Sequence, residues 1–334
     1  MDLARTLTTP APVSALALGP AGQLLAGSDD GSVRVYDPVS WKVAHAIRGL
    51  PADVASIVCT PSGDVWVASG RSAYAFSTAS QKLVQTVSDA IASLVLGEDE
   101  EDVLNELALS KTHLAFSTDS GTVGVVDLST NAVSRMKTRH TSICGNVRFI
   151  PVRPRELLSA GYDSALLHFD FALGTILSRR DITAPASTDG VSLSPPFILS
   201  AAMTGTGAVA AGTADGRLWV SCGGDKSVNS GKKKRSRRWE GLNEEDEILE
   251  KIAEGPVVAM SFSGSSTLLV STLLGTLTQY TISRSASDEL QLSKNTEIQV
   301  GIAKVNALVC DDQKVAIAGL TADGKGIIEI RTVP

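Results

Sequence analysis

The chain contains few cysteines and few aromatic residues, and each shortage excludes a class of protein. Its cysteines form no Cys-x-x-Cys pair and stand far apart, at Cys59, Cys144, Cys222 and Cys310. We therefore expect neither a disulfide framework nor a zinc site, and we interpret them as small buried residues or as exposed thiols of a reducing compartment. Aromatic residues make up only 4% of the chain, so a core must be filled mainly by Val, Leu, Ile and Ala.

Long apolar runs and an excess of positive charge are also absent. The segment from Met1 to Thr9 is too short and too polar for a signal peptide or a membrane span, so we expect no membrane association. The formal net charge is −6, which gives the protein as a whole no electrostatic preference for nucleic acid. Long amphipathic helical patterns are scarce, which disfavours a parallel sheet covered by helices. Material for a core is nevertheless ample, because 43% of the residues are hydrophobic.

The segment from Val13 to Asp37 is the most informative part of the chain. Two alternating runs, Val13–Leu18 and Ser32–Tyr36, flank a short apolar stretch, and the turns between them contain Pro20 and the pair Asp30-Gly31. An Asp-Gly pair between two such runs is a strong hairpin signal, because both central residues of a two-residue turn need positive φ. The segment therefore predicts three short antiparallel strands in a row.

This pattern returns along the whole chain. Successive turns lie roughly 40 to 60 residues apart, near the period of a four-stranded propeller blade. A fourth strand must follow each hairpin, as at Lys42 to Ile47 and at Lys82 to Thr86. We count seven copies: Val13–Asp37, Val54–Phe76, Asn105–Asp127, His140–Asp170, Phe197–Val220, Val257–Ile282 and Val305–Arg331.

The fourth copy carries the clearest set of polar residues. His140 precedes its first strand, Ser159 lies on the second and Asp163 lies in the hairpin, while Phe169 and Asp170 end the third strand. This arrangement resembles the WD-repeat β-propeller family, whose blades often carry His, Ser or Thr, Asp and a Trp-Asp pair at these places. The resemblance covers nearly the whole chain. It implies that His140, Ser159 and Asp163 form a hydrogen-bonded chain that locks the blade, with Phe169 in place of the tryptophan.

We therefore predict an all-β fold, a seven-bladed β-propeller with four-stranded antiparallel blades. Residues 1–334 are expected to form a single domain, because blades stack on one another and close into one unit. The segment Leu3 to Leu7 directly precedes the first strand. We expect this N-terminal strand to close the ring beside Ile327 to Arg331, as the outer strand of the last blade, because closure removes an exposed sheet edge.

One charged insertion, at about residues 223–254, interrupts the repeats. A Gly- and Ser-rich stretch leads to six basic side chains in seven positions, and Trp239 follows them directly. Behind them we expect Asn243 to cap a short helix, with Glu244 to Glu247 in its first turn and Ile248, Leu249 and Ile252 on its apolar side. The basic segment consists of Lys232, Lys233, Lys234, Arg235, Arg237 and Arg238.

Three interpretations of this basic segment stay open. It can be a nuclear localisation signal, a nucleic-acid or phosphate-binding patch, or a solvated loop held near the acidic residues behind it. We rank them in that order. In the second interpretation Trp239 stacks on a base.

No group of residues in the sequence points to catalysis. A His, a Ser and an Asp in one blade can be mistaken for a hydrolase triad, but Ser159 does not lie in a Gly-x-Ser-x-Gly turn. The glycines at Gly205 and Gly207 lack the Lys and the helix of a phosphate loop. No histidine stands at metal-ligand spacing from another His or Cys. We therefore expect no enzymatic activity, no cofactor and no metal.

A propeller without catalytic residues holds loops rigidly at two faces, and binding residues lie disproportionately on such loops. We expect a protein-interaction scaffold or adaptor that binds other proteins through these faces, a monomer within a larger complex, in the nucleus and the cytoplasm. The resemblance further implies a substrate receptor that docks on the adaptor of a cullin-RING ubiquitin ligase. The docking signature of that class is Trp-Asp-x-Arg, whereas blade ends here read Tyr36-Asp-Pro-Val39, Val126-Asp-Leu-Ser129 and Phe169-Asp-Phe-Ala172. The alternative is a nucleic-acid-linked assembly factor, for example in ribosome biogenesis, that uses residues 232–238.

Overall fold

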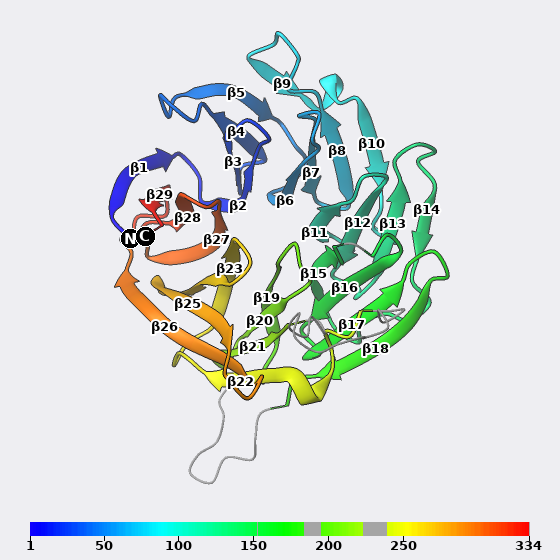
Figure 1. The fold of residues 1–334 in the computed structure, drawn as a ribbon. Helices are drawn as coiled ribbons and strands as arrows, with labels where there is room; N and C mark the ends of the chain where they lie inside the picture. The colour runs from blue at the N-terminus through cyan, green and yellow to red at the C-terminus, as the bar shows by residue number, and fades with distance from the viewer. Residues whose placement is uncertain (152, 184–194, 223–238, 334) are drawn as a thin grey trace.

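The computed structural model describes residues 1–151, 153–183, 195–222 and 239–333. Within these ranges the chain folds into seven sheets, six with four strands and one with five. Figure 1 shows that the sheets are arranged in a ring, each with its first strand nearest the central axis. Adjacent strands within a sheet are antiparallel, with one exception in blade 1. The predicted seven-bladed β-propeller is thus confirmed.

The first three blades follow one another in the first part of the chain. Blade 1 contains β2 (Val13–Leu18), β3 (Leu24–Ser28), β4 (Ser32–Tyr36), β5 (Val43–Arg48) and β9 (Val84–Thr86). Blade 2 contains β6 (Val54–Cys59), β7 (Val65–Ser69), β8 (Ser72–Phe76) and β10 (Ala92–Val95), and the 3₁₀ turn η1 (Val87–Asp89) precedes β10. Blade 3 contains β11 (Leu104–Leu109), β12 (His113–Thr118), β13 (Val123–Asp127) and β14 (Val133–Arg135).

The remaining four blades complete the ring. Blade 4 contains β15 (Cys144–Phe149), β16 (Glu156–Gly161), β17 (Ala165–Asp170) and β18 (Thr175–Asp181). Blade 5 contains β19 (Ile198–Met203), β20 (Val209–Thr213), β21 (Arg217–Ser221) and β22 (Glu247–Lys251), with the 3₁₀ turn η2 (Glu244–Asp246) before β22. Blade 6 contains β23 (Val257–Ser263), β24 (Thr267–Thr272), β25 (Thr276–Arg284) and β26 (Leu290–Gln299). Blade 7 contains β27 (Lys304–Cys310), β28 (Lys314–Leu320), β29 (Gly326–Thr332) and β1 (Leu3–Thr9).

Strand β1 closes the ring as the sequence predicted. It pairs antiparallel with β29, where Leu7 lies opposite Ile328. The two ends of the chain are also joined outside the strand pair, because the guanidinium of Arg331 donates to the carbonyl of Met1 at 3.2 Å. Figure 1 shows the N- and C-terminal ends side by side at this blade.

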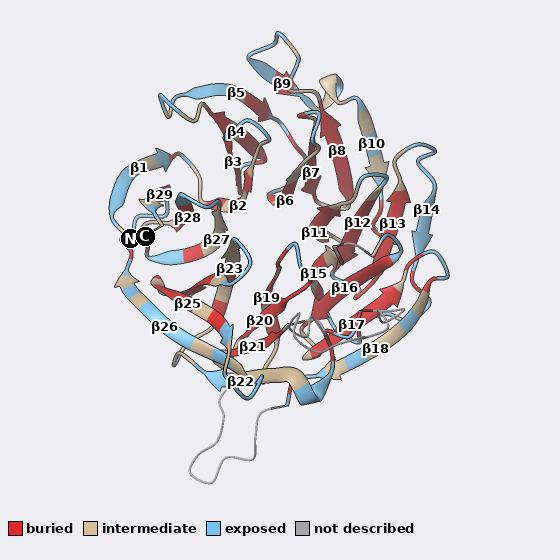
Figure 2. Ribbon diagram, viewed as in Figure 1, coloured by how far each residue is buried: buried red, intermediate tan, exposed pale blue. Residues whose placement is uncertain are grey.

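The core lies between neighbouring blades. Every residue of β3, β7 and β8 is buried, whereas the outer strands β14 and β26 are largely exposed (Figure 2). Sheets that pack on both faces need apolar side chains on both faces, which explains the near-continuous apolar runs of the inner strands. The clusters between blades consist mostly of Val, Leu, Ile and Ala, as the low aromatic content required. Trp219, Phe76, Phe116 and Phe169 are the largest fully buried side chains.

The fourth strand of blade 2 is not where the sequence pattern placed it. Residues 84–86, expected to end that strand, instead form β9, which pairs in parallel with β5 of blade 1. The carbonyl of Leu83 accepts from the amide of Ala46 at 2.9 Å, and the buried Gln85 donates to the carbonyl of Ser77 at 3.0 Å. The outer strand of blade 2 is β10. A short apolar segment does not encode which of two adjacent sheet edges it joins, so local pattern alone gave the wrong partner.

The first hairpin was predicted correctly, but its turn differs. Three residues, Asp29 to Gly31, join β3 to β4, and of these only Gly31 has a positive φ, at 67°. The amide of Gly31 donates to the carbonyl of Ser28 at 3.1 Å. A three-residue loop with one left-handed residue at its end makes the hairpin without a second positive φ.

The helix expected after Asn243 is wrong beyond its first turn. Asn243 does act as a cap, because its side chain accepts from the amide of Glu245 at 3.2 Å. The turn ends at Asp246, and Ile248 and Leu249 then belong to β22, the outer strand of blade 5, where Leu249 pairs with Trp219. The open edge of β21 offers a row of backbone hydrogen bonds, which outweighs the local helical pattern. The insertion therefore ends before residue 247.

Candidate functional site

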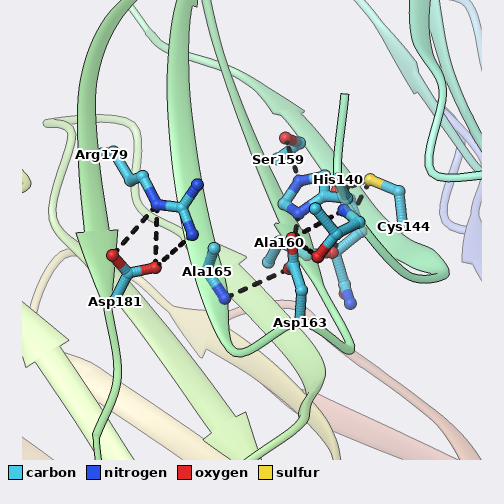
Figure 3. A network of polar contacts seen from close by, with 10 residues as sticks. His140, Cys144, Ser159, Ala160, Asp163, Ala165, Arg179 and Asp181 are labelled. Carbon is cyan, nitrogen blue, oxygen red and sulfur yellow. Dashed lines mark hydrogen bonds and ion pairs between the residues drawn. The ribbon is translucent and has the colours of Figure 1, made fainter. Parts of the chain in front are cut away.

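The structure brings together three of the polar residues singled out in the fourth copy (Figure 3). The Nδ1 atom of His140 lies 2.8 Å from Oδ1 of Asp163, and its Nε2 atom lies 2.7 Å from Oγ of Ser159. His140 and Ser159 are each 1% exposed. Phe169, in the adjacent strand β17, is fully buried. A serine hydroxyl at this depth is out of reach of a substrate carbonyl.

Asp163 ties the loop before β15 to the hairpin between β16 and β17. Its carboxylate also accepts from the amides of Thr141 at 3.0 Å and Ala165 at 3.3 Å. Burial acts to raise the pKa of Asp163, but the hydrogen bond and the charge of His140, together with the two amides, hold the pKa below its usual value. Gly161 completes the arrangement, because a Cβ there would lie 2.5 Å from Nδ1 of His140.

A second buried network in blade 4 escaped the sequence analysis. The Nε2 atom of His168 lies 3.0 Å from Oε2 of Glu156, and its Nδ1 atom lies 3.0 Å from Oγ of Ser178. His168 is fully buried and Glu156 is 9% exposed. Alternation along β17 puts His168 on the face opposite Phe169. It does not identify the partner, since Glu156 lies twelve residues earlier in the chain.

Trp239 joins this second network and is not available to stack on a base. Its amide donates to Oε2 of Glu156 at 3.1 Å, and its indole Nε1 donates to the carbonyl of Gly207 at 2.9 Å. The indole ring meets the His168 ring edge-on, with 5.2 Å between centroids. Only 5% of Trp239 is exposed. Its expected role as a nucleic-acid-stacking residue is therefore wrong, because the ring is part of the core between blades 4 and 5.

Three of the acidic residues that follow Trp239 pair with arginines of the propeller. Arg180 of β18 donates to Glu247 at 2.8 Å and to Glu244 at 3.1 Å, and Arg284 of β25 donates to Asp246 at 2.5 Å. The basic residues Lys232, Lys233, Lys234, Arg235, Arg237 and Arg238 lie outside the described residues.

The seven first strands surround a central cavity of about 550 Å³. Glu106 and Arg148 form an ion pair on its wall, and Arg148 also donates to the carbonyl of Ala201 at 3.2 Å. Phe262 and Leu308 line the cavity on other blades. One wall is thus charged and another apolar. Among the described residues the buried Nδ2 atom of Asn146 has no hydrogen-bond partner.

Hydrogen bonds join every neighbouring pair of blades around this cavity. Each first strand has a register shift near its start, which is a β-bulge that turns one residue out of the regular pairing. In chain order the bonds are Ser14 Oγ to Val54 O (2.8 Å), Leu107 N to Ser56 Oγ (3.1 Å), Asn105 Nδ2 to Cys144 O (3.2 Å), Ala201 N to Asn146 Oδ1 (3.0 Å), Ser200 Oγ to Val257 O (3.0 Å), Ser263 Oγ to Asp311 O (3.1 Å) and Asn306 Nδ2 to Val13 O (2.9 Å).

This ring of contacts was not foreseen, although its signal is present in the sequence. A Ser or an Asn stands near the start of most first strands, as at Ser14, Asn105, Asn146 and Asn306. Comparison of the seven copies position by position would have exposed these residues. The described part of the chain contains no cluster of three or more potential metal ligands and no helix long and apolar enough to cross a membrane.

Two comparisons place this architecture among known proteins. A solved structure titled "Crystal structure of WD40 beta propeller domain of Doa1" matches with a TM-score of 0.72 and 11% sequence identity, over 98% of this chain and 96% of that one. At this identity the match concerns the fold. The family described as "WD domain, G-beta repeat" matches residues 1–37. Together the findings show the WD40 β-propeller fold and one segment that matches the WD40 repeat.

The matched residues 1–37 explain how the repeat maps onto the structure. They contain the closing strand β1 of blade 7 and the first three strands of blade 1, β2 to β4. One sequence repeat therefore spans two blades. Because the sequence repeat begins with the outer strand of one blade and ends with the third strand of the next, the first repeat also closes the ring.

Proposed function

We propose that this protein is a non-enzymatic protein-interaction scaffold or adaptor, a monomer within a larger complex. The observation that carries this proposal is the unbroken ring of inter-blade hydrogen bonds together with closure by β1. Both constraints fix the loops at the two faces, so that a partner meets a preorganised surface and little ordering entropy is lost on binding. The polar and apolar walls of the central cavity add groups that a partner can contact.

Affinity purification followed by mass spectrometry tests this proposal. The full chain is purified from cells before and after nuclease treatment, and a variant lacking residues 1–8 serves as a control with an open ring. A partner that survives nuclease and is lost from the open-ring variant supports the scaffold. Recovery of no stable partner would count against it.

The finer proposal is that the scaffold serves as a substrate receptor of a cullin-RING ubiquitin ligase. It draws on the family resemblance alone, and the blade ends carry no Arg at the position where the docking signature has one. Docking would therefore have to use other residues of a propeller face. Recovery of the ligase's propeller-containing adaptor among the purified partners would support the substrate-receptor role, and its absence would contradict it.

We further propose that the protein is present in both nucleus and cytoplasm, with residues 232–238 as the nuclear localisation signal. The support is the composition of the segment, which has six basic side chains in seven positions after a Gly- and Ser-rich stretch. The same basic segment also supports the alternative function, an assembly factor that binds RNA. Phosphate contacts release counterions, so RNA binding by the basic segment should weaken steeply with salt.

Within the family, we propose that the chain is a relative of WD repeat-containing protein 53. The resemblance rests on residues 139–154, followed by residues 157–163, and on a lysine-rich insertion late in the chain. These residues include His140, Ser159 and Asp163. Comparison of the fourth blade of a solved structure of that protein with the present one would test it, since a relative should share the buried pair of His140 and Asp163.

A further inference from the structure

A second cavity, of about 340 Å³, lies between blades 1 and 2. It opens near the turns that follow the first strands, at Gly19 and Gly63. Its lining is mostly apolar, and Gln23, Asp37, His45 and Thr78 contribute polar groups. The walls consist mainly of Leu25 and Val35 from blade 1 and of Cys59 and Val65 from blade 2.

The repeat makes it possible to ask what occupies the same place elsewhere in the ring. In blade 1 Leu25 pairs with Val35, and in blade 4 Leu158 pairs with His168 at the same register, two residues before the aspartate that ends each copy. On the facing blade, Gly63 of blade 2 and Gly207 of blade 5 take the same turn, with φ of 98° and 96°. The cavity between blades 1 and 2 is therefore equivalent to a site between blades 4 and 5.

Between blades 4 and 5 that site is filled by an indole. Trp239 packs against His168 and Leu158, and its Nε1 donates to the carbonyl of Gly207. The chain supplies this ring from outside the regular repeat, because Trp239 precedes the 3₁₀ turn and the outer strand of blade 5.

Two other junctions are filled by rings of the chain as well. Between blades 3 and 4, Phe171 packs on Phe149 with 5.5 Å between centroids, and also meets His113 of blade 3 at 5.0 Å. Between blades 7 and 1, Trp41 lies near Gly22, and Nζ of Lys314 sits 5.3 Å from its ring centroid. The space left at this junction is only about 100 Å³.

Blade 2 has small side chains where blade 4 has rings. Cys59 ends β6 as Phe149 ends β15, and Thr78 stands two residues after Phe76 as Phe171 stands two after Phe169. A cavity of about 150 Å³ with apolar walls is large enough to bind benzene. The present cavity is more than twice that size and therefore has room for an indole.

We propose that this cavity, the blade 1–2 pocket, is a docking site for an aromatic side chain of a partner protein. The proposal rests on the proposed scaffold function and names the chemistry that one of its surfaces recognises. The carbonyl of Gly63 already accepts from Oγ1 of Thr78 at 2.7 Å, and a carbonyl oxygen has a second lone pair for an indole N–H. A partner's tryptophan would thus repeat the contact that Trp239 makes with Gly207.

The first test uses N-acetyl-tryptophanamide as the probe and saturation-transfer NMR as the readout. The full chain should give a saturable signal with a dissociation constant on the order of 1 mM. Thr78→Phe, which copies the filler of blade 4, should weaken binding by at least about tenfold. Leu173→Phe adds a ring at a 59%-exposed position of blade 4 and should leave binding unchanged. Equal binding to Thr78→Phe and wild type would overturn the proposal.

A second measurement needs no variant, which guards against misfolding of Thr78→Phe. Burial raises the pKa of the Cys59 and Cys310 thiols to about 11, so both should react slowly with a maleimide. The probe should slow alkylation of Cys59, which lines the pocket, and leave Cys310 unaffected. Equal rates for Cys59 with and without the probe would overturn the pocket assignment.

Two further experiments decide whether the pocket binds an aromatic side chain of a protein or a small aromatic molecule. A capped peptide with a central Trp should compete with N-acetyl-tryptophanamide, whereas the same peptide with Ala should not. If free indole binds and the Trp peptide does not, the pocket takes a small molecule and the docking proposal is overturned. A partner recovered equally by wild type and by Thr78→Phe would leave the scaffold function standing and refute this docking site alone.

Discussion

Asp163→Ala removes the residue on which the buried network of blade 4 depends. The carboxylate accepts from Nδ1 of His140, whose side chain is fully buried, and from the amide of the exposed Thr141. In the variant water can reach the amide of Thr141 but not the imidazole. A buried donor left without a partner costs about 1–3 kcal/mol, so we expect a loss of about 2–3 kcal/mol in the free energy of unfolding.

Asp30 provides the matched control, because it occupies the same hairpin position in blade 1. It accepts from the amide of Ser32 at 3.2 Å and pairs with Arg34 at 3.6 Å, and its side chain is 39% exposed. No histidine depends on it. Asp30→Ala should therefore cost less than about 1 kcal/mol. Urea unfolding followed by tryptophan fluorescence measures both variants.

The pH dependence of stability, measured with Asp163→Asn, gives an independent check on the same carboxylate. Despite burial, hydrogen bonds from His140 and the backbone hold the pKa of Asp163 below its usual value in the folded state. A lowered pKa contributes stability that is present above the unfolded-state pKa, about 3.9, and is lost as the pH falls through the folded pKa. The advantage of wild type over Asp163→Asn should thus be constant near neutrality and shrink below about pH 4. In the urea experiment, equal losses of unfolding free energy in Asp163→Ala and Asp30→Ala would refute the role assigned to the buried network.

Three further perturbations test other parts of the fold. Deletion of residues 1–8 should lower the free energy of unfolding by several kcal/mol, since each lost backbone hydrogen bond to β29 contributes about 1 kcal/mol. An unchanged melting temperature would contradict closure by β1. Trp239→Ala should cost about 3–5 kcal/mol in urea unfolding through the cavity it leaves, whereas Trp239→Phe should cost clearly less. Replacing the six basic residues of 232–238 by Ala should change stability by less than about 0.5 kcal/mol and reduce nuclear accumulation of a fluorescent fusion. Unchanged location with loss of RNA binding would favour the assembly-factor function.

Features encoded within about thirty residues were predictable from the sequence. The hairpin at Gly31 belongs to this class, because turn residues and strand alternation lie close together in the chain. The pair of His140 with Asp163 was instead implied by the resemblance to the WD-repeat family. Closure by β1 was predictable for a different reason. The segment Leu3 to Leu7 directly precedes the first strand, and closing the ring removes an exposed sheet edge.

Features that depend on distant partners were not predictable. Trp239 follows six basic residues, which suggested a nucleic-acid contact, but its environment comes from Glu156 and Gly207, 83 and 32 residues away. The segment containing Ile248 and Leu249 has a pattern compatible with a helix or an edge strand. Only the open edge of β21 decides between them. The pattern of β9 likewise says nothing of which blade it joins.

Differences between the copies are more informative about function than the pattern they share. Polar contacts around the central cavity recur at all seven junctions, so they serve the ring, whatever the protein binds. Aromatic rings, by contrast, come from a different place at each of the three junctions where they were found, as Phe171, Trp239 and Trp41 show. These three junctions thus fill the same place with rings from different segments of the chain. A junction where small residues leave that requirement unmet, as between blades 1 and 2, is therefore where a partner has most to gain by supplying the ring.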